Sequence, residues 1–184
     1  MTTEDLRFYS VTDKYIDFLF EYDKKVARQK GYKGERNYCG TVLKIGFLNY
    51  FVPFTSYKAD KEEQMNRRNR IVLKIHELDN LDNQLGYLLF NNMIPVPESE
   101  LIPIIIDLNS ELTTPKDRML LKQYLFIKEE ENTDRILNKA ELVYRKQTEG
   151  RDGYYQNWCC NFKKLELCCT SYHDSIAVPL EEKV

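Results

Sequence analysis

Hydrophobic positions near the start of the chain change from a strand-like to a helical spacing. Residues 7–11 are β-prone, and Thr12 follows them as a plausible N-cap. Apolar side chains then recur every three or four residues, at Tyr15, Ile16, Leu19, Phe20 and Val26. This spacing predicts a short strand over 7–11 and an amphipathic helix over about 13–28.

The middle of the chain contains short apolar runs separated by turn residues, which is typical of strands. We expect strands over 38–45, 50–54, 70–76 and 84–90, an extended segment over 93–97, and a short buried strand or helical turn over 101–108. Pro53 cannot donate to a ladder, so the 50–54 strand should end there or lie at an edge. The polar residues 55–69 predict a long loop, and such loops are often functional. Short connections favour an antiparallel sheet.

The last third of the chain is predicted to be helical. Thr114 before Pro115 matches an N-cap followed by proline at the first helical position. A second helix should begin at 132 or 133 and end at 150–153, and Asn161 should cap a short final helix. The pattern therefore predicts an α+β fold with a helical C-terminal third.

Length and composition limit the class of protein. The chain has 184 residues, so we expect one domain over 1–184, and 42% hydrophobic with 30% charged residues is typical of a folded protein. The longest strongly apolar run, 101–106, is too short to span a bilayer, and no secretory signal precedes it, so we expect a cytoplasmic protein. A net charge of −2 excludes a strongly basic, nonspecific polyanion binder.

The small net charge conceals a segregation of charge along the chain. Residues 76–112 hold seven acidic residues and no Lys or Arg, whereas 24–36 and 58–74 are rich in Lys and Arg. Such basic segments could hold an RNA backbone. From charge alone, ordinary solvated loops remain the favoured interpretation.

Cysteine and histidine provide no metal or nucleophile pattern. The five cysteines include two adjacent pairs, 159–160 and 168–169, which do not have the usual spacing of zinc ligands. We interpret them as reduced, buried, small hydrophobic residues, and we expect no metal and no cofactor. The two histidines are His76 and His173; nothing places them together, and His76 is interpreted as structural. Common nucleotide-binding, zincin and hydrolase motifs are missing from the sequence.

One cluster suits phosphate chemistry. Thr55, Ser56 and Lys58 follow directly after the predicted 50–54 strand, at the start of the polar loop. Their two hydroxyls and one ammonium can together bind a phosphate. Arg36, with Tyr32 four residues upstream, should approach the same end of the sheet through the 38–54 hairpin. In RNA the attacking 2′-OH belongs to the substrate, so a protein needs mainly to orient the phosphate and stabilise developing charge.

These residues, with others downstream, resemble the ToxN/AbiQ family of endoribonuclease toxins from type III toxin–antitoxin and phage abortive-infection systems. The resemblance runs from about Phe8 to Phe162. It is carried by Lys14-Tyr15-Ile16, Gly40-x-Val42-Leu43, Pro53-x-Thr55-Ser56-x-Lys58, Leu73-Lys74-Ile75-His76-Glu77, Asn83-Gln84-Leu85-Gly86, Met93-Ile94-Pro95, Arg118-Met119-Leu120, Lys122-Gln123, Phe126-Ile127 and Cys160-Asn161-Phe162.

The resemblance implies a strongly twisted antiparallel sheet, a partial barrel like that of MazF-type toxins, flanked by helices. It implies metal-independent RNA cleavage that leaves 2′,3′-cyclic phosphate and 5′-OH ends. The implied catalytic cluster is Tyr32, Arg36, Thr55, Ser56 and Lys58. Some family members have lysine at the position of Arg36, and a guanidinium is a poor acid or base, so Arg36 should hold phosphate.

The resemblance also implies a small repeated, structured antitoxin RNA as inhibitor, cut from its precursor by the toxin, together with cellular mRNA as substrate. It implies no membrane partner and a closed toxin–RNA assembly held mainly by RNA contacts. Charge segregation predicts RNA contacts at Lys24, Lys25, Lys33, Lys61, Arg67, Arg68 and Arg70. The resemblance adds Arg118 and Lys122 to these predicted contacts. Two alternatives remain open: a noncatalytic RNA-binding module, and a MazF-like toxin inhibited by a protein antitoxin.

Overall fold

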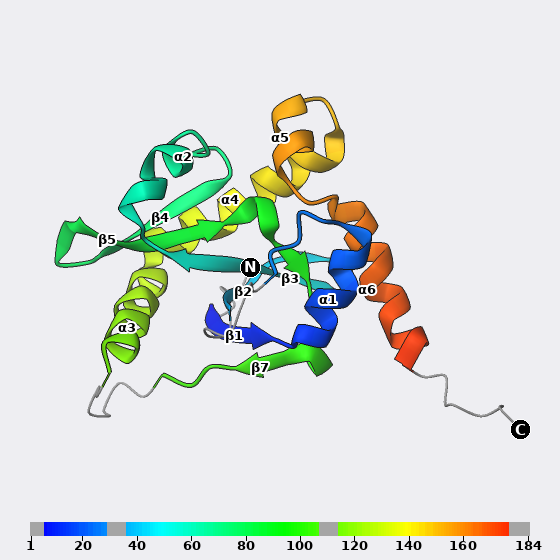
Figure 1. Ribbon diagram of the computed structural model, residues 1–184, viewed down its shortest axis with the longest axis horizontal. Coiled ribbons are helices and arrows are strands. Elements are labelled where there is room, and N and C mark those ends of the chain that lie inside the picture. The colour runs from blue at the N-terminus through cyan, green and yellow to red at the C-terminus, as the bar shows by residue number, and fades with distance from the viewer. Residues whose placement is uncertain (1–5, 29–35, 107–113, 177–184) are drawn as a thin grey trace, which may run out of the picture.

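The computed structural model describes residues 6–28, 36–106 and 114–176, in which strands form one antiparallel sheet (Figure 1). The strands are β1 (Arg7–Val11), β2 (Asn37–Ile45), β3 (Leu48–Ser56), β4 (Val72–Glu77), β5 (Asn80–Leu89), β6 (Ile94–Pro95) and β7 (Leu101–Pro103). Their order is β4-β5-β3-β2-β1-β7, and β6 pairs with β3. The sheet is twisted but not closed, and with its flanking helices it confirms the predicted α+β fold class.

Within the described residues, six α-helices flank this sheet. They are α1 (Asp13–Tyr22), α2 (Glu62–Asn66), α3 (Pro115–Lys128), α4 (Glu130–Glu149), α5 (Gly153–Trp158) and α6 (Phe162–Ile176). Helix α3 packs on β4 and β5, α4 packs on β2, and α1 lies beside α6 at the other end of the molecule (Figure 1). In the described segments, no helix has both the length and the apolar character needed to cross a membrane.

Local chemistry fixes several helix ends as predicted. The Thr12 side chain accepts a hydrogen bond from the backbone N–H of Tyr15, and Thr114 forms a capping box with Asp117. Asn161 accepts from the N–H of Lys164 at 3.1 Å. Gly150 ends α4 with a φ of 68°, in the left-handed region that favours glycine. The predicted α3 and α6 start positions are therefore confirmed.

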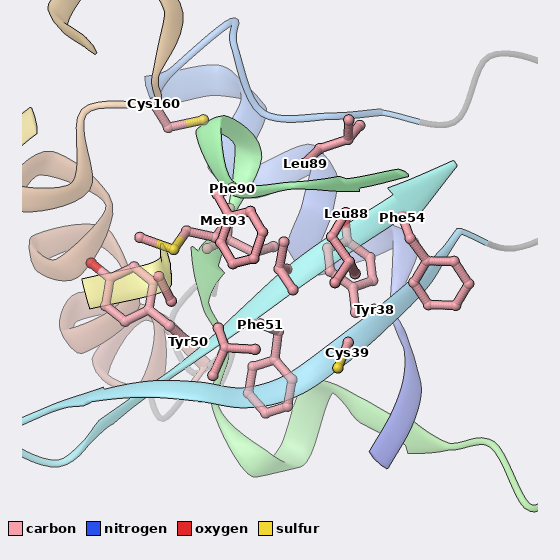
Figure 2. Packing of buried hydrophobic residues seen from close by; sticks show 14 of the residues in the cluster. Tyr38, Cys39, Tyr50, Phe51, Phe54, Leu88, Leu89, Phe90, Met93 and Cys160 are labelled. Carbon is pink, nitrogen blue, oxygen red and sulfur yellow. The ribbon is translucent and has the colours of Figure 1, made fainter. Parts of the chain in front are cut away.

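The core lies between β2, β3 and the helices. Figure 2 shows Leu88, Phe90 and Met93 gathered beside the cyan strands that carry Tyr38 and Tyr50. The ring centres of Phe54 and Phe8 lie 4.8 Å apart, and those of Phe8 and Tyr124 of α3 lie 5.8 Å apart. Burying each such aromatic side chain contributes about 1.5–3 kcal/mol, so these contacts hold α3 on the sheet.

The five cysteines have free thiols and are buried, which confirms their interpretation as buried small residues. Cys39 lies in β2, Cys159 and Cys160 precede α6, and Cys168 and Cys169 lie on it. Burial raises the pKa of Cys159 to about 12.

Several predicted element boundaries are wrong. The first helix ends at Tyr22, because Asp23 has extended backbone. The strand around Pro53 does not end at that residue but continues to Ser56 inside the sheet. On the side of β3 away from β2, β6 pairs with residues before Pro53 and β5 pairs with residues after it. The segment 55–69 is not a loop throughout, because it contains a 3₁₀ turn over 59–61 and α2.

Further corrections concern the second half of the chain. The predicted buried segment 101–108 forms a strand only over 101–103, and Ile102 and Ile105 are exposed; residues 107–113 lie outside the described residues. Helix α4 begins at Glu130 rather than at 132 or 133. Residue 153 begins the unpredicted helix α5 instead of ending α4, and the final helix spans 15 residues rather than being short.

Candidate active site

The predicted phosphate cluster lies at the end of β3. Thr55 and Ser56 are the last residues of the strand, and Lys58 keeps extended backbone with φ −143° and ψ 121°. Successive side chains of an extended segment point to opposite faces, so Ser56 and Lys58 project to the same side. Both are exposed, whereas Thr55 and Tyr57 are half-buried. One face of this strand end therefore presents a hydroxyl and an ammonium to solvent.

A β-bulge adjoins this strand end. Ser56 pairs with Gly86 of β5, and on the other side of β5 Ile75 pairs with Gly86 while His76 pairs with Gln84. Leu85 is therefore an extra residue without a counterpart in β4. Its carbonyl accepts the N–H of Tyr57 at 3.2 Å, which extends the ladder beyond Ser56. Bulges of this kind re-aim side chains and are frequent beside active sites.

Gly86 is required by close packing at this position. A Cβ built on Gly86 would lie 2.4 Å from the carbonyl oxygen of Thr55, a distance that side chains do not tolerate. The absence of a side chain lets β3 and β5 approach closely beside Ser56. The sequence signal for this feature was an isolated glycine inside a strand pattern, which indicates a bulge or a close backbone approach.

Arg36 reaches the same end of the sheet from β2. Tyr38 pairs with Pro53, and continuing this register by two residues places Arg36 across from Thr55. Arg36 is half-buried, and its positive charge partly opposes the increase that burial causes in the pKa of Tyr38. This register places Arg36 and Thr55 at the same end of the β2–β3 pair, as predicted. Tyr32 and Lys33 lie outside the described residues.

Tyr57 anchors α2 to the strand end. Its hydroxyl donates to Glu62 at 3.0 Å, and this hydrogen bond raises the pKa of Tyr57. Lys74 of β4 lies 3.9 Å from the same carboxylate. The backbone of Lys58 therefore lies between a ladder hydrogen bond at residue 57 and a helix that is fixed through Glu62.

The basic residues predicted to contact RNA lie on separate elements. Lys24 and Lys25 follow α1, Lys61 and Arg67–Arg70 surround α2, and Arg118 and Lys122 lie on α3. Several ammonium or guanidinium groups already have protein partners. Lys25 donates to the carbonyls of Gln156 and Cys159 at 2.7 and 2.9 Å, and Lys122 lies 2.6 Å from Glu77.

The arginines after α2 lie against the aromatic residues of α5. The guanidinium of Arg68 lies 4.3 Å from the ring centre of Trp158, and that of Arg70 lies 4.6 Å from the ring centre of Tyr154. Arg67 pairs with Glu63 at 2.5 Å. Trp158 is 44% exposed, so the residue is accessible to solvent although the guanidinium of Arg68 lies over its ring. Sequence reasoning missed Trp158 because α5 was not predicted.

His76 is not part of this cluster. Its Nδ1 lies 2.6 Å from the carbonyl oxygen of Leu81 in the β4–β5 hairpin, and β5 separates its strand from that of Ser56. The position supports the structural interpretation of His76. Among the described residues, no group of three His, Cys, Asp or Glu side chains is placed to hold a metal ion.

The open, twisted antiparallel sheet with its flanking helices matches the fold of solved toxin endoribonucleases. A family profile described as toxin ToxN of the type III toxin–antitoxin system matches residues 7–170. The chain belongs to this ToxN family, and the expected enzyme class, an endoribonuclease, is confirmed by its named relatives.

The relatives match over nearly their full length. Endoribonuclease AbiQ of Lactococcus lactis subsp. lactis is 45% identical over 173 residues, covering 91% of this chain and 89% of the relative. Endoribonuclease ToxN of Bacillus thuringiensis subsp. kurstaki is 39% identical over 180 residues, covering 95% and 88%.

Solved structures agree with the sequence relatives. A structure of AbiQ, described as a lactococcal anti-phage endoribonuclease of the type III toxin–antitoxin system, superposes with a TM-score of 0.83 at 44% identity, covering 93% of this chain and 99% of that one. A structure concerned with selective toxin inhibition by a non-coding RNA pseudoknot has a TM-score of 0.79 at 35% identity, covering 93% and 99%.

Proposed function

We propose that this protein cleaves cellular mRNA in the cytoplasm without a metal ion, as the toxin of a phage-defence system, and that one domain carries the whole activity. The observation that carries the proposal is the exposed pair of Ser56 and Lys58 on one face of the bulged strand end, with Thr55 and Arg36 beside it. This set supplies donors and positive charge to a phosphate but no strong base or covalent nucleophile, which suits a substrate that brings its own 2′-OH.

In the proposed reaction the 2′-oxygen attacks the adjacent phosphorus as its proton passes to a solvent water. The new 2′-O–P bond forms while the P–O5′ bond breaks, and the 5′-oxygen takes up a proton, leaving 2′,3′-cyclic phosphate and 5′-OH ends. Lys58 stabilises the pentacoordinate phosphate or protonates the 5′-oxygen, and Ser56 donates to a nonbridging oxygen or helps to activate the 2′-OH. Arg36 and Thr55 fix the phosphate, and Tyr32 contributes stacking or a hydrogen bond. Losing one such donor typically costs about 10²–10³ in rate.

The test is single-turnover cleavage of an RNA with a 2′-deoxy substitution at the scissile nucleotide. We expect no cleavage of this substrate by the wild-type protein, and we expect Lys58→Ala and Ser56→Ala to lose about 10²–10³ in rate on normal RNA while still binding the antitoxin. Lys44→Ala is the matched control, because Lys44 is exposed at the opposite end of the β2–β3 hairpin. Cleavage of the 2′-deoxy substrate at the normal rate would refute the mechanism.

We propose that the inhibitor of this protein is a small, structured, repeated RNA that the toxin processes, and that RNA contacts hold a closed assembly together. One related structure concerns inhibition by a non-coding RNA pseudoknot, and another a processed non-coding RNA that regulates an antiviral system. On this chain the surface that suits such an RNA is formed by Arg67, Arg68 and Arg70 with Trp158. Cations bind the phosphates, and the exposed indole can stack on an unpaired base.

Trp158 allows a direct test of this surface, because it is the single tryptophan of the chain. We expect antitoxin RNA to quench its fluorescence, and Arg67→Glu with Arg68→Glu to weaken binding and reduce its salt dependence. Lys44→Glu is the control for a single charge reversal elsewhere on the surface. Unchanged fluorescence on saturation with RNA would show that the RNA binds elsewhere.

A further inference from the structure

The amide of Gln123 is buried beside the strand end that carries Ser56. Gln123 lies on α3 and is 3% exposed, and the neighbouring buried residues of this helix, Phe126 and Ile127, are apolar. A polar side chain at a helix–sheet contact is costly unless it makes a hydrogen bond. The buried amide of Gln123 therefore needs a specific hydrogen-bond partner.

That partner is the carbonyl of the bulge. The Nε2 of Gln123 donates to the carbonyl oxygen of Leu85 at 3.4 Å, in a buried contact. The same oxygen accepts the backbone N–H of Tyr57 at 3.2 Å. A carbonyl oxygen has two lone pairs, so both donors can be satisfied together. One oxygen therefore joins α3 to the residue between Ser56 and Lys58.

The missing side chain of Gly86 makes room for this contact. The Nε2 of Gln123 lies 3.4 Å from the place where a Cβ on Gly86 would stand, and Gly86 is the cross-strand partner of Ser56. Side chains of directly paired residues lie on the same face of a sheet. The amide thus approaches from the face to which Ser56 and Lys58 project.

We infer that Gln123 is a positioning residue of the catalytic site, which holds the Leu85 carbonyl in place and through it the Ser56–Lys58 segment. The inference rests on the proposed cleavage mechanism. Gln123 touches neither Ser56 nor Lys58 through a hydrogen bond of its own; it acts through the bulge. Because misplacing a catalytic group by about 1 Å can cost on the order of 10²-fold in rate, loss of the amide should slow the chemical step and leave RNA binding nearly unchanged.

Two variants separate positioning from general stability. Gln123→Met keeps the shape of the side chain but has no donor, and we expect about 10–100-fold slower single-turnover cleavage at saturating RNA, with a similar Kd for antitoxin RNA. Gln123→Glu has no donor when ionised, but its protonated carboxyl can donate to the Leu85 carbonyl. The ratio of its rate to the wild-type rate should therefore rise several-fold between about pH 8 and about pH 5.5, since burial raises carboxyl pKa values. The ratio for Gln123→Met should stay flat.

Gln147→Met is the matched control, because Gln147 is also a buried glutamine, on α4, and its Oε1 has no hydrogen-bond partner in the described structure. It should leave the rate unchanged. A wild-type rate for Gln123→Met, a loss equal to that of the Gln147 control, or a pH-independent ratio for Gln123→Glu would overturn the inference. If Gln123→Met does not fold, the pH ratio of Gln123→Glu decides alone. Failure of the wild-type protein to cleave RNA would instead refute the proposed function.

Discussion

Substituting alanine for Gly86 tests whether the close approach of β3 and β5 sets the geometry of the candidate site. The new Cβ would stand 2.4 Å from the carbonyl oxygen of Thr55, 3.3 Å from its carbonyl carbon and 3.4 Å from the Nε2 of Gln123. The first of these contacts involves backbone, which cannot rotate away. Because Cβ contacts below 3.0 Å are essentially never seen, the strands must separate locally by about 0.6 Å.

Two opposing effects determine the change in stability. Overpacking of this kind costs about 1–3 kcal/mol of stability. Stretching the hydrogen bond from the N–H of Tyr57 to the carbonyl of Leu85, already 3.2 Å long, adds to this cost. Alanine also restricts the unfolded chain, which offsets about 0.4–1 kcal/mol. We expect a net loss of about 1–2 kcal/mol, or a Tm lower by about 2–8 °C for a chain of this size.

The effect on catalysis should exceed the effect on folding. A displacement of about 0.6 Å at Ser56 should slow single-turnover RNA cleavage by about 10–100-fold even at temperatures where the variant is fully folded. Gly153→Ala is the control, because no atom lies within 4 Å of its added Cβ. A Gly86→Ala protein with wild-type Tm and wild-type cleavage rate would refute the reasoning.

Three further predictions concern charge and burial elsewhere. Hydrogen bonds from Lys122 and Asn83 lower the pKa of Glu77 in the folded protein. The stabilising contribution of the Glu77 carboxylate is therefore present above its unfolded pKa of about 4.3 and is lost as pH falls through the folded pKa. The Tm difference between wild type and Glu77→Gln should accordingly disappear in acid. Because all five thiols are buried and burial raises the pKa of each, the native protein should react with a thiol reagent at pH 8 only after denaturant is added, and fast reaction would contradict this. Lys25→Met should lower Tm by about 2–4 °C, since two carbonyls lose their donor, and should weaken RNA binding less than Arg67→Glu, measured on the same RNA.

Local sequence determined much of the secondary structure. Thr12, Thr114 and Asn161 cap helices because their side chains satisfy nearby backbone N–H groups, and that chemistry needs no distant partner. The hairpin between β2 and β3 followed from two apolar runs around a turn. The candidate phosphate cluster was also visible, because Thr55, Ser56 and Lys58 fall within four residues of the chain, and the family resemblance they carried was confirmed.

Tertiary structure decided the features that join distant segments. Helix α1 stops at Tyr22 although the apolar period continues to Val26. Helix α5 forms where its aromatic rings meet the arginines after α2, which no local pattern contains. The bulge at Leu85 exists only in the pairing of β5 with two neighbours, and the amide of Gln123 reaches it from a helix 38 residues further along the chain. The sequence therefore determined which groups are candidates for the chemistry, while packing between elements fixed where those groups stand, because orientation depends on contacts that only the folded chain brings together.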